Sequence, residues 1–264
     1  MLQAVFYDLL SELEALECLH QLIRYPYIES LGNYRYAFHD LLHEIQAREI
    51  REQEPKKWRE YHRRALDHLT QVSPRSPDRY YHALAYDEKR GVSDWEDAVQ
   101  EAQLRGEREF LGELLQVAHD GTLELSPATR ASRAYWQGRF YYYGSEMQAA
   151  LASYEQALTL FRQVGDRLGE ANCYLAQGRV ALEQENYSKA LTLHTEAYQL
   201  YQQIQDAYSQ ARLLYYRSLV YEAMDEQHSA IQDLEKALVI ALRLSLPFID
   251  LLRQRLEALK EGSR

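Results

Sequence analysis

The chain has 264 residues, of which 46% are hydrophobic and 27% charged, and its formal net charge is −10. This composition is typical of a folded protein and excludes a wholly disordered chain. The low counts of glycine and proline, 11 and 6, argue against an all-β sandwich or barrel, which needs many turns. The apolar runs are far shorter than the roughly 18 residues of a membrane span. The negative charge opposes non-specific binding to nucleic-acid phosphates.

The first fifty residues predict a helix, a hairpin and a second helix. Leucines recur at helical spacing over residues 8–24. Two short aromatic segments, 25–30 and 34–40, lie on either side of Leu-Gly-Asn, a pattern that indicates a small β-hairpin. A helix is expected from His39 to about Gln53.

This order of elements resembles a winged helix at its junction with a repeat array. The residues that support the likeness are Leu22-Ile23 and the string Tyr34-Arg35-Tyr36-Ala37-Phe38-His39-Asp40-Leu41-Leu42. The family is that of the signal-transduction ATPases with numerous domains, and the resemblance covers residues 1–54. In that family a nucleotide-binding core precedes the winged helix, and an inducer-sensing repeat array follows it. The sequence contains no G-x-x-x-x-G-K-[ST] loop, so the family's ATP hydrolysis is not carried over.

Residues 55–125 are expected to be degenerate helical repeats. Ala98 and Ala102 lie on the second helix of one unit, and Ser93 to Glu96 has the form of a capping box that begins this helix. A further helix is predicted over residues 110–120.

From residue 126 onward the sequence repeats with a period of forty. Within each unit the apolar residues follow the spacing of one helix face, and small residues allow two helices to approach closely. The predicted helix pairs are 126–143 with 147–163, 166–183 with 187–203, and 206–223 with 227–243. Residues 246–260 are expected to form a capping half-unit.

The spacing of small, aromatic and alanine residues in these units resembles the tetratricopeptide repeat. The matching residues are Gly138, Tyr141, Ala150, Tyr154 and Ala157, then Gly178, Ala181, Ala190, His194 and Ala197, then Ser218, Tyr221, Ala230, Leu234 and Ala237. The usual unit has 34 residues, and its early tryptophan and closing proline are absent here. The resemblance implies an all-α solenoid of helical hairpins, after the small winged-helix-like segment. The predicted domains are therefore 1–54, 55–125 and 126–264.

In this repeat family the first helix of each unit lines a concave inner face, which takes a protein or peptide. Among the positions carried over, Arg139, Arg179 and Arg212 stand out in an acidic chain. Arginine pairs with carboxylates, and tyrosine gives rigid contact area, so we expect a partner with acidic groups. The predicted ligand-binding residues are Ser132, Tyr135, Arg139, Tyr142, Tyr143, Asn172, Leu175, Arg179, Arg212 and Tyr215.

No residue pattern supports an enzyme, a cofactor or a metal site. His39 and His43 have zinc-ligand spacing, but no third ligand is predictable, and packing at the junction explains them. A phosphohydrolase built on His39-Asp40 with His62 and His68 lacks its further ligands. Cys173 is expected to be a buried thiol, because it lies among small and aromatic residues.

The basic stretch between Arg48 and Arg64, with Trp58 and Tyr61 interleaved, leaves DNA binding open. The preferred interpretation is a solvated helix with the ion pairs Glu52–Lys56 and Glu60–Arg64.

The sequence thus favours a non-enzymatic scaffold or adaptor that binds a protein or peptide in its groove. The first alternative is a ligand-sensing regulatory module that works with a separate ATPase chain, and the second is DNA binding through the N-terminal segment. Self-association is left open. Two cysteines cannot build a disulfide framework, and the acidic start lacks the basic region of a secretory signal, so a cytoplasmic location is expected.

Overall fold

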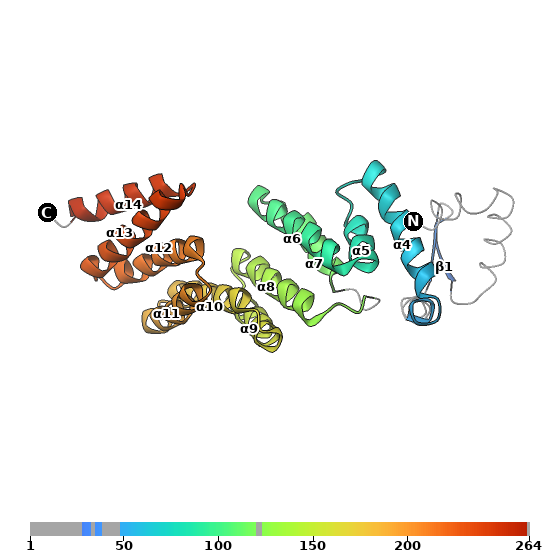
Figure 1. The fold of residues 1–264 in the computed structure, drawn as a ribbon, viewed down its shortest axis with the longest axis horizontal. Coiled ribbons are helices and arrows are strands. Elements are labelled where there is room, and N and C mark those ends of the chain that lie inside the picture. Colours follow the sequence, from blue (N-terminus) through green and yellow to red (C-terminus); the bar gives the residue numbers. More distant parts are fainter. Residues whose placement is uncertain (1–27, 33–34, 39–47, 120–122, 263–264) are drawn as a thin grey trace. The chain divides into compact units, whose positions relative to one another are not determined.

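The computed structural model describes residues 28–32, 35–38, 48–119 and 123–262, and most of them are helical (Figure 1). The chain divides into two compact units, residues 1–125 and residues 126–264. In the part of the chain that is described, no helix has the length and apolar character that a bilayer crossing requires.

The predicted hairpin near the N-terminus is confirmed. Strands β1 (Ile28–Gly32) and β2 (Arg35–Phe38) pair in antiparallel fashion, with Ile28 opposite Phe38. Residues 48–53 are helical, in agreement with the end of the helix expected after the hairpin. The helix predicted over 8–24 and the start of the helix predicted at His39 lie outside the described residues. The winged-helix-like segment therefore stays a prediction.

The rest of the first unit consists of the helices α4 (Pro55–Val72), α5 (Pro77–Tyr86), α6 (Glu88–Arg105) and α7 (Arg108–Val117), each packed on the next. Trp95 of α6 is fully buried, and its indole nitrogen donates a hydrogen bond of 2.7 Å to the carbonyl of Leu114. The capping box predicted at Ser93 is wrong, because that residue lies inside α6. The helix is capped six residues earlier, where the side chain of Asp87 accepts a hydrogen bond from the backbone N–H of Arg90.

The second unit contains the three predicted helix pairs. They are α8 (Pro127–Tyr143) with α9 (Met147–Val164), α10 (Arg167–Glu183) with α11 (Tyr187–Gln203), and α12 (Ala207–Ala223) with α13 (Gln227–Leu244). The predicted half-unit at the end is α14 (Ile249–Gly262). Its Leu252 is fully buried against Leu214 and Leu234, so α14 covers the apolar side of the last pair.

The recurring small residues are the points of closest helix contact. The alanines at the two repeating positions are all fully buried, namely Ala150, Ala157, Ala190, Ala197, Ala230 and Ala237. A Cβ on Gly138 would lie 2.5 Å from the ring of Tyr154, so only glycine permits this approach of α8 and α9.

The turns between the helices share a left-handed residue at intervals of twenty: Ser145, Gly165, Glu185, Gln205, Asp225 and Ser245. The next backbone N–H donates a hydrogen bond to the carbonyl five residues before it, as Asn186 does to Ala181. This is the hydrogen bond of a Schellman motif, which satisfies carbonyls at the end of a helix and reverses the chain. Each half-unit therefore ends with the same turn, although only one of the six residues is glycine.

Candidate functional site

The first helices of the three repeat units, α8, α10 and α12, lie side by side in the second unit, with α10 in contact with both neighbours (Figure 1). Their side chains surround a cavity of about 70 Å³. Eight of the ten predicted ligand-binding residues line it: Tyr135, Arg139, Tyr142, Tyr143, Asn172, Leu175, Arg179 and Arg212. The forty-residue register thus brings equivalent positions of successive units to one place.

Two of the predicted residues do not line this cavity. Ser132 is half-buried elsewhere on α8, and Tyr215 packs against the apolar cluster under α14. The cavity also takes Tyr154, Ala176 and Tyr216, which were not predicted. Ala176 and Tyr216 are forty residues apart, so they share one repeat position. That shared register could have indicated both of them. Tyr154 lies on α9, and the sequence identified it only as a residue of the repeat motif.

Arg179 lies at the centre of this group of residues. Its guanidinium carbon is 4.7 Å from the ring centre of Tyr142 on α8 and 4.6 Å from that of Tyr216 on α12. Such cation–π contacts stabilise the guanidinium and fix its position. One arginine of the middle unit therefore connects all three units.

Arg212, which lines the same cavity, is held by a hydrogen-bond network. The side-chain oxygen of Asn172 accepts hydrogen bonds from Nη2 of Arg212, at 2.9 Å, and from the hydroxyl of Tyr201, at 2.7 Å. The Nε of Arg212 is buried and has no partner among the described residues. Arg212 thus keeps one unused donor.

Arg139 completes the set from α8. Its guanidinium stacks 4.6 Å from the ring centre of Trp136. Within the described residues, no carboxylate forms an ion pair with Arg139, Arg179 or Arg212. The only carboxylate hydrogen-bonded to a lining tyrosine in this part of the chain is the exposed Glu183, which accepts from the Tyr142 hydroxyl at 3.3 Å.

The positive charge of the arginines changes the acidity of a tyrosine at the cavity. Burial raises the pKa of Tyr143, but the nearby charges of Arg179 and Arg139 and their hydrogen bonds to the hydroxyl outweigh it. The pKa therefore lies below its usual range. The Tyr143 hydroxyl is thus a stronger hydrogen-bond donor than an ordinary tyrosine, and it suits an anionic acceptor.

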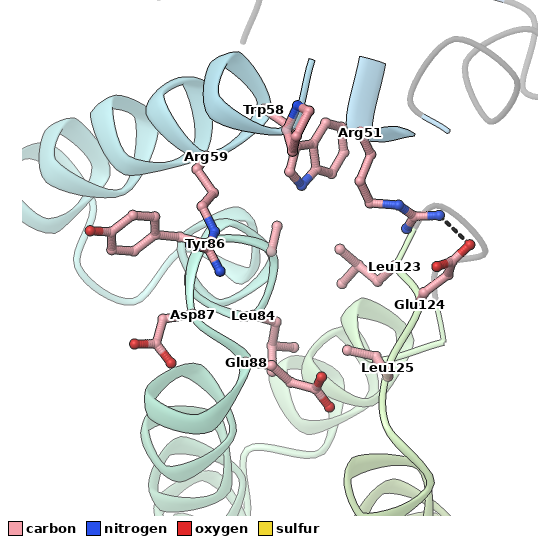
Figure 2. Close-up of a pocket in the computed structure, with 12 residues that line it drawn as sticks. Arg51, Trp58, Arg59, Leu84, Tyr86, Asp87, Glu88, Leu123, Glu124 and Leu125 are labelled. Carbon is pink, nitrogen blue, oxygen red and sulfur yellow. Dashed lines mark ion pairs between the residues drawn. The ribbon is translucent and has the colours of Figure 1, made fainter. Parts of the chain in front are cut away.

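The first unit contains a second, larger cavity of about 580 Å³, which the sequence did not indicate. Trp58 and Leu84 form an apolar part of its wall, and Arg51 forms an ion pair with Glu124 (Figure 2). Arg59 and Asp87 lie at another side of the same space. This lining mixes both signs of charge and selects no single ligand class.

The other residues considered for chemistry have structural surroundings. His62 is buried and faces His82, with 2.7 Å between their Nδ1 atoms. Burial raises the pKa of the Cys173 thiol, which makes it unreactive. Among the described residues no group of three metal-ligating side chains occurs, and His39 and His43 lie outside them.

Part of the basic stretch on α4 is paired with nearby carboxylates. Arg64 donates to Glu60 at 2.7 Å, which is the ion pair expected from the sequence, and Arg63 bridges Glu60 and Asp67. Arg51, before α4, pairs with Glu124. The expected pair between Glu52 and Lys56 is not formed. These local pairs reduce the positive potential available to a nucleic acid.

A family model for the tetratricopeptide repeat matches residues 130–203. Residues 126–262 thus form a tetratricopeptide-type solenoid. No curated protein matches the sequence.

Solved structures with this fold have low sequence identity to the chain. BtubC (BKLC) from P. vanneervenii is 18% identical, with a TM-score of 0.53 over 79% of this chain and 84% of that one. The apo form of RapI is 14% identical, with a TM-score of 0.57 over 65% of this chain and 64% of that one. A signal-transduction ATPase with a tetratricopeptide-repeat sensor, from Pyrococcus horikoshii, is 15% identical. Its TM-score is 0.55, over 92% of this chain and 42% of that one. The chain spans less than two thirds of the last two proteins, and the likeness to all three concerns the fold.

Proposed function

We propose that the chain is a non-enzymatic binding module that takes an acidic protein segment or peptide on the inner face of α8, α10 and α12. The observation that supports this is the convergence of Arg139, Arg179 and Arg212, from three successive units, on one tyrosine-lined cavity. The cavity residues come from rigid helices, so the surface is ordered before a partner arrives, which lowers the entropy cost of binding.

The charge distribution of the chain favours an acidic partner for this face. The whole chain carries a net charge of −10, whereas these three arginines have no carboxylate partner among the described residues. An acidic segment is therefore repelled by most of the surface and attracted at this place. Such complementarity gives specificity and faster association.

Binding of randomised peptide pools tests this proposal. One pool has aspartate and glutamate at fixed central positions, and a matched pool has lysine there. Fluorescence anisotropy should show saturable binding of the acidic pool alone. The double variant Arg139→Gln, Arg179→Gln should weaken it by at least about tenfold, because charge-assisted contacts supply most of the affinity.

The matched control is Arg243→Gln, which removes one positive charge from an exposed site on α13, away from the cavity residues. Its affinity should stay within about twofold of the wild type, since an exposed distant charge is screened. The proposal is wrong if the acidic pool does not bind. It is equally wrong if Arg243→Gln weakens binding as much as the double variant.

A sensor role beside a separate ATPase chain is the second proposal, and the Pyrococcus horikoshii structure, which matches 92% of this chain, supports it. Affinity capture from native lysate with and without ATP tests it. Nucleotide-dependent recovery of an ATPase chain is the expected result. Recovery of the same proteins in both conditions would contradict a nucleotide-regulated role.

A further inference from the structure

The three cavity arginines form no ion pair among the described residues, in contrast to three other arginines of the second unit. Arg162 pairs with Glu170, Arg217 with Asp233 and Arg255 with Glu222, each at 2.8 Å or less. Removing a guanidinium from water without a counter-ion costs free energy. The cavity therefore concentrates positive charge that no carboxylate of the described residues neutralises.

The number and placement of these charges distinguish between kinds of anion. The side chains of Arg139, Arg179 and Arg212 come from three neighbouring helices, α8, α10 and α12, and line the same cavity. A carboxylate has one negative charge and two oxygens, which one guanidinium fork satisfies. A phosphate monoester has nearly two negative charges and three terminal oxygens, so it can accept from three guanidinium groups at once.

The arginines are held so that their donors stay available. The rings of Tyr142 and Tyr216 cover Arg179 and fix it, while its N–H groups lie in the guanidinium plane and can donate sideways, as they do to the Tyr143 hydroxyl. Asn172 fixes Arg212, whose Nε has no partner among the described residues. Little side-chain entropy is left to lose when an anion binds.

The size of the cavity limits what enters it. A space of about 70 Å³ holds a few water-sized groups, so it accepts a compact anionic group. The remainder of a bound peptide must lie along the inner face, outside the cavity.

We propose that this cavity binds the phosphate dianion of a phosphorylated peptide side chain. This inference rests on the proposed peptide-binding function and assigns the chemistry of its central contact. Arg179 holds the phosphate between the units, Arg139 and Arg212 contact its other oxygens, and the Tyr143 hydroxyl donates a further hydrogen bond.

Isothermal titration calorimetry with three short peptides tests the inference. Their flanking residues are identical and uncharged, and the central residue is phosphoserine, glutamate or serine. The phosphoserine peptide should bind at least about tenfold more tightly than the glutamate peptide at pH 7.5, because it places a second charge among three guanidinium groups. Its advantage should shrink toward pH 5, because the second phosphate pKa is about 6. Equal affinity of the two peptides overturns the inference and leaves the proposed function standing if acidic peptide pools bind.

Variants assign the effect to the cavity. Arg139→Gln should remove most of the preference for phosphoserine over glutamate. It should leave the fold intact because this side chain forms no ion pair among the described residues and contacts the rings of Tyr135 and Trp136 and the Tyr143 hydroxyl. Arg179→Lys keeps the charge but loses the planar fork, and it should keep part of the preference. Arg243→Gln should keep all of it. A preference that survives Arg139→Gln and Arg179→Lys unchanged would place the phosphate elsewhere and overturn the inference.

Competition by free phosphoserine and by inorganic phosphate separates the two sources of a phosphate dianion. Both should displace the phosphopeptide only at concentrations at least about tenfold higher than the peptide itself, because they lack its contacts along the inner face. If inorganic phosphate binds as tightly as the phosphopeptide, the cavity is a site for small phosphate compounds, and the peptide part of the inference is wrong.

Discussion

Gly178 of α10 lies against the imidazole of His194 on α11, so closely that a Cβ at residue 178 would be 2.4 Å from Cδ2 of His194. His194 is fully buried, and its ring cannot move into solvent. Gly138 and Tyr154 have the same relationship one unit earlier. The glycine of each pair thus sets the spacing of two helices, and the bulky partner fills the groove opposite it.

The substitution Gly178→Ala should therefore destabilise the protein by about 2 kcal/mol, the usual cost of forcing an extra carbon into a packed core. Urea denaturation followed by circular dichroism measures the loss. The same substitution in a His194→Ala background should be neutral or stabilising, because Ala is the better helix former once the ring is gone. Equal losses in both backgrounds would mean that the ring contact is not the cause.

Glu185 ends a turn in the left-handed region, with a φ of 58°. A side chain is unfavourable there, so Glu185→Gly should raise the free energy of unfolding by about 0.5 to 1 kcal/mol. The preceding residue, Gln184, has a φ of −88°. Gln184→Gly should give no gain, because it only adds freedom to the unfolded chain. A gain at Gln184, or none at Glu185, measured by the midpoint of urea unfolding, would contradict the backbone argument.

The glycine contacts and the helix-ending turns show which features of the fold the sequence could predict. The forty-residue register of Gly138, Gly178 and Ser218 predicted the helix pairs, because the spacing of small residues directly reflects helix packing. The left-handed turns could not be predicted, because five of the six residues are not glycine and the packing of the helices imposes their conformation. Sequence alone also misplaced the start of α6, since Ser93 has a capping-box pattern inside a continuous helix.

The candidate site was predicted to a similar depth. Eight lining residues followed from the inner-face positions that the resemblance to the repeat implies, but those positions do not say how far each side chain reaches. Tyr215 and Tyr216 are adjacent on α12, and the helix turn directs only Tyr216 into the cavity. The cavity of the first unit depends on Trp58, Leu84 and Leu125, which are distant in the sequence and share no repeat position.

His62 and His82 form a buried pair in the first unit, with 2.7 Å between their Nδ1 atoms, so one must donate to the other while both stay neutral. Burial lowers the pKa of His82 to about 4, and burial together with the charge of His82 lowers that of His62 to about 3. The unfolded chain takes up these protons near pH 6.5. Below that pH the unfolded state binds more protons than the folded state, so stability should fall as the pH drops from about 6.5 toward about 4.

The expected loss is roughly 1 kcal/mol per pH unit for each of the two histidines. Urea unfolding at a series of pH values between 8 and 5 measures the slope. The double variant His62→Leu, His82→Leu should reduce the slope of stability against pH. The remaining slope includes the contribution of His194, whose pKa burial lowers to about 3. His68→Gln, at an exposed site on the same helix α4, should leave the slope unchanged. An unaltered slope in the double variant would show that the pair is not responsible.

Arg217 of α12 and Asp233 of α13 form a two-point ion pair, with Nε and Nη2 at 2.6 and 2.8 Å from the carboxylate oxygens. The Asp233 side chain is only 4% exposed. Asp233→Asn leaves a buried guanidinium without its counter-charge and should cost about 3 kcal/mol. The exposed pair Arg253–Asp250 is the control, and Asp250→Asn should cost less than about 0.5 kcal/mol.

The preceding repeat unit shows that the fold does not require this ion pair. Forty residues before Arg217 and Asp233 stand Gln177 and Leu193. The double variant Arg217→Gln, Asp233→Leu copies that arrangement, and it should be within about 1 kcal/mol of the wild type, because replacing both members of a buried pair removes the unpaired charge as well. Urea unfolding of Asp233→Asn and of the double variant shows whether the pair adds net stability or only compensates for its own burial. If the double variant is as unstable as Asp233→Asn, the pair contributes net stability beyond compensating its own burial.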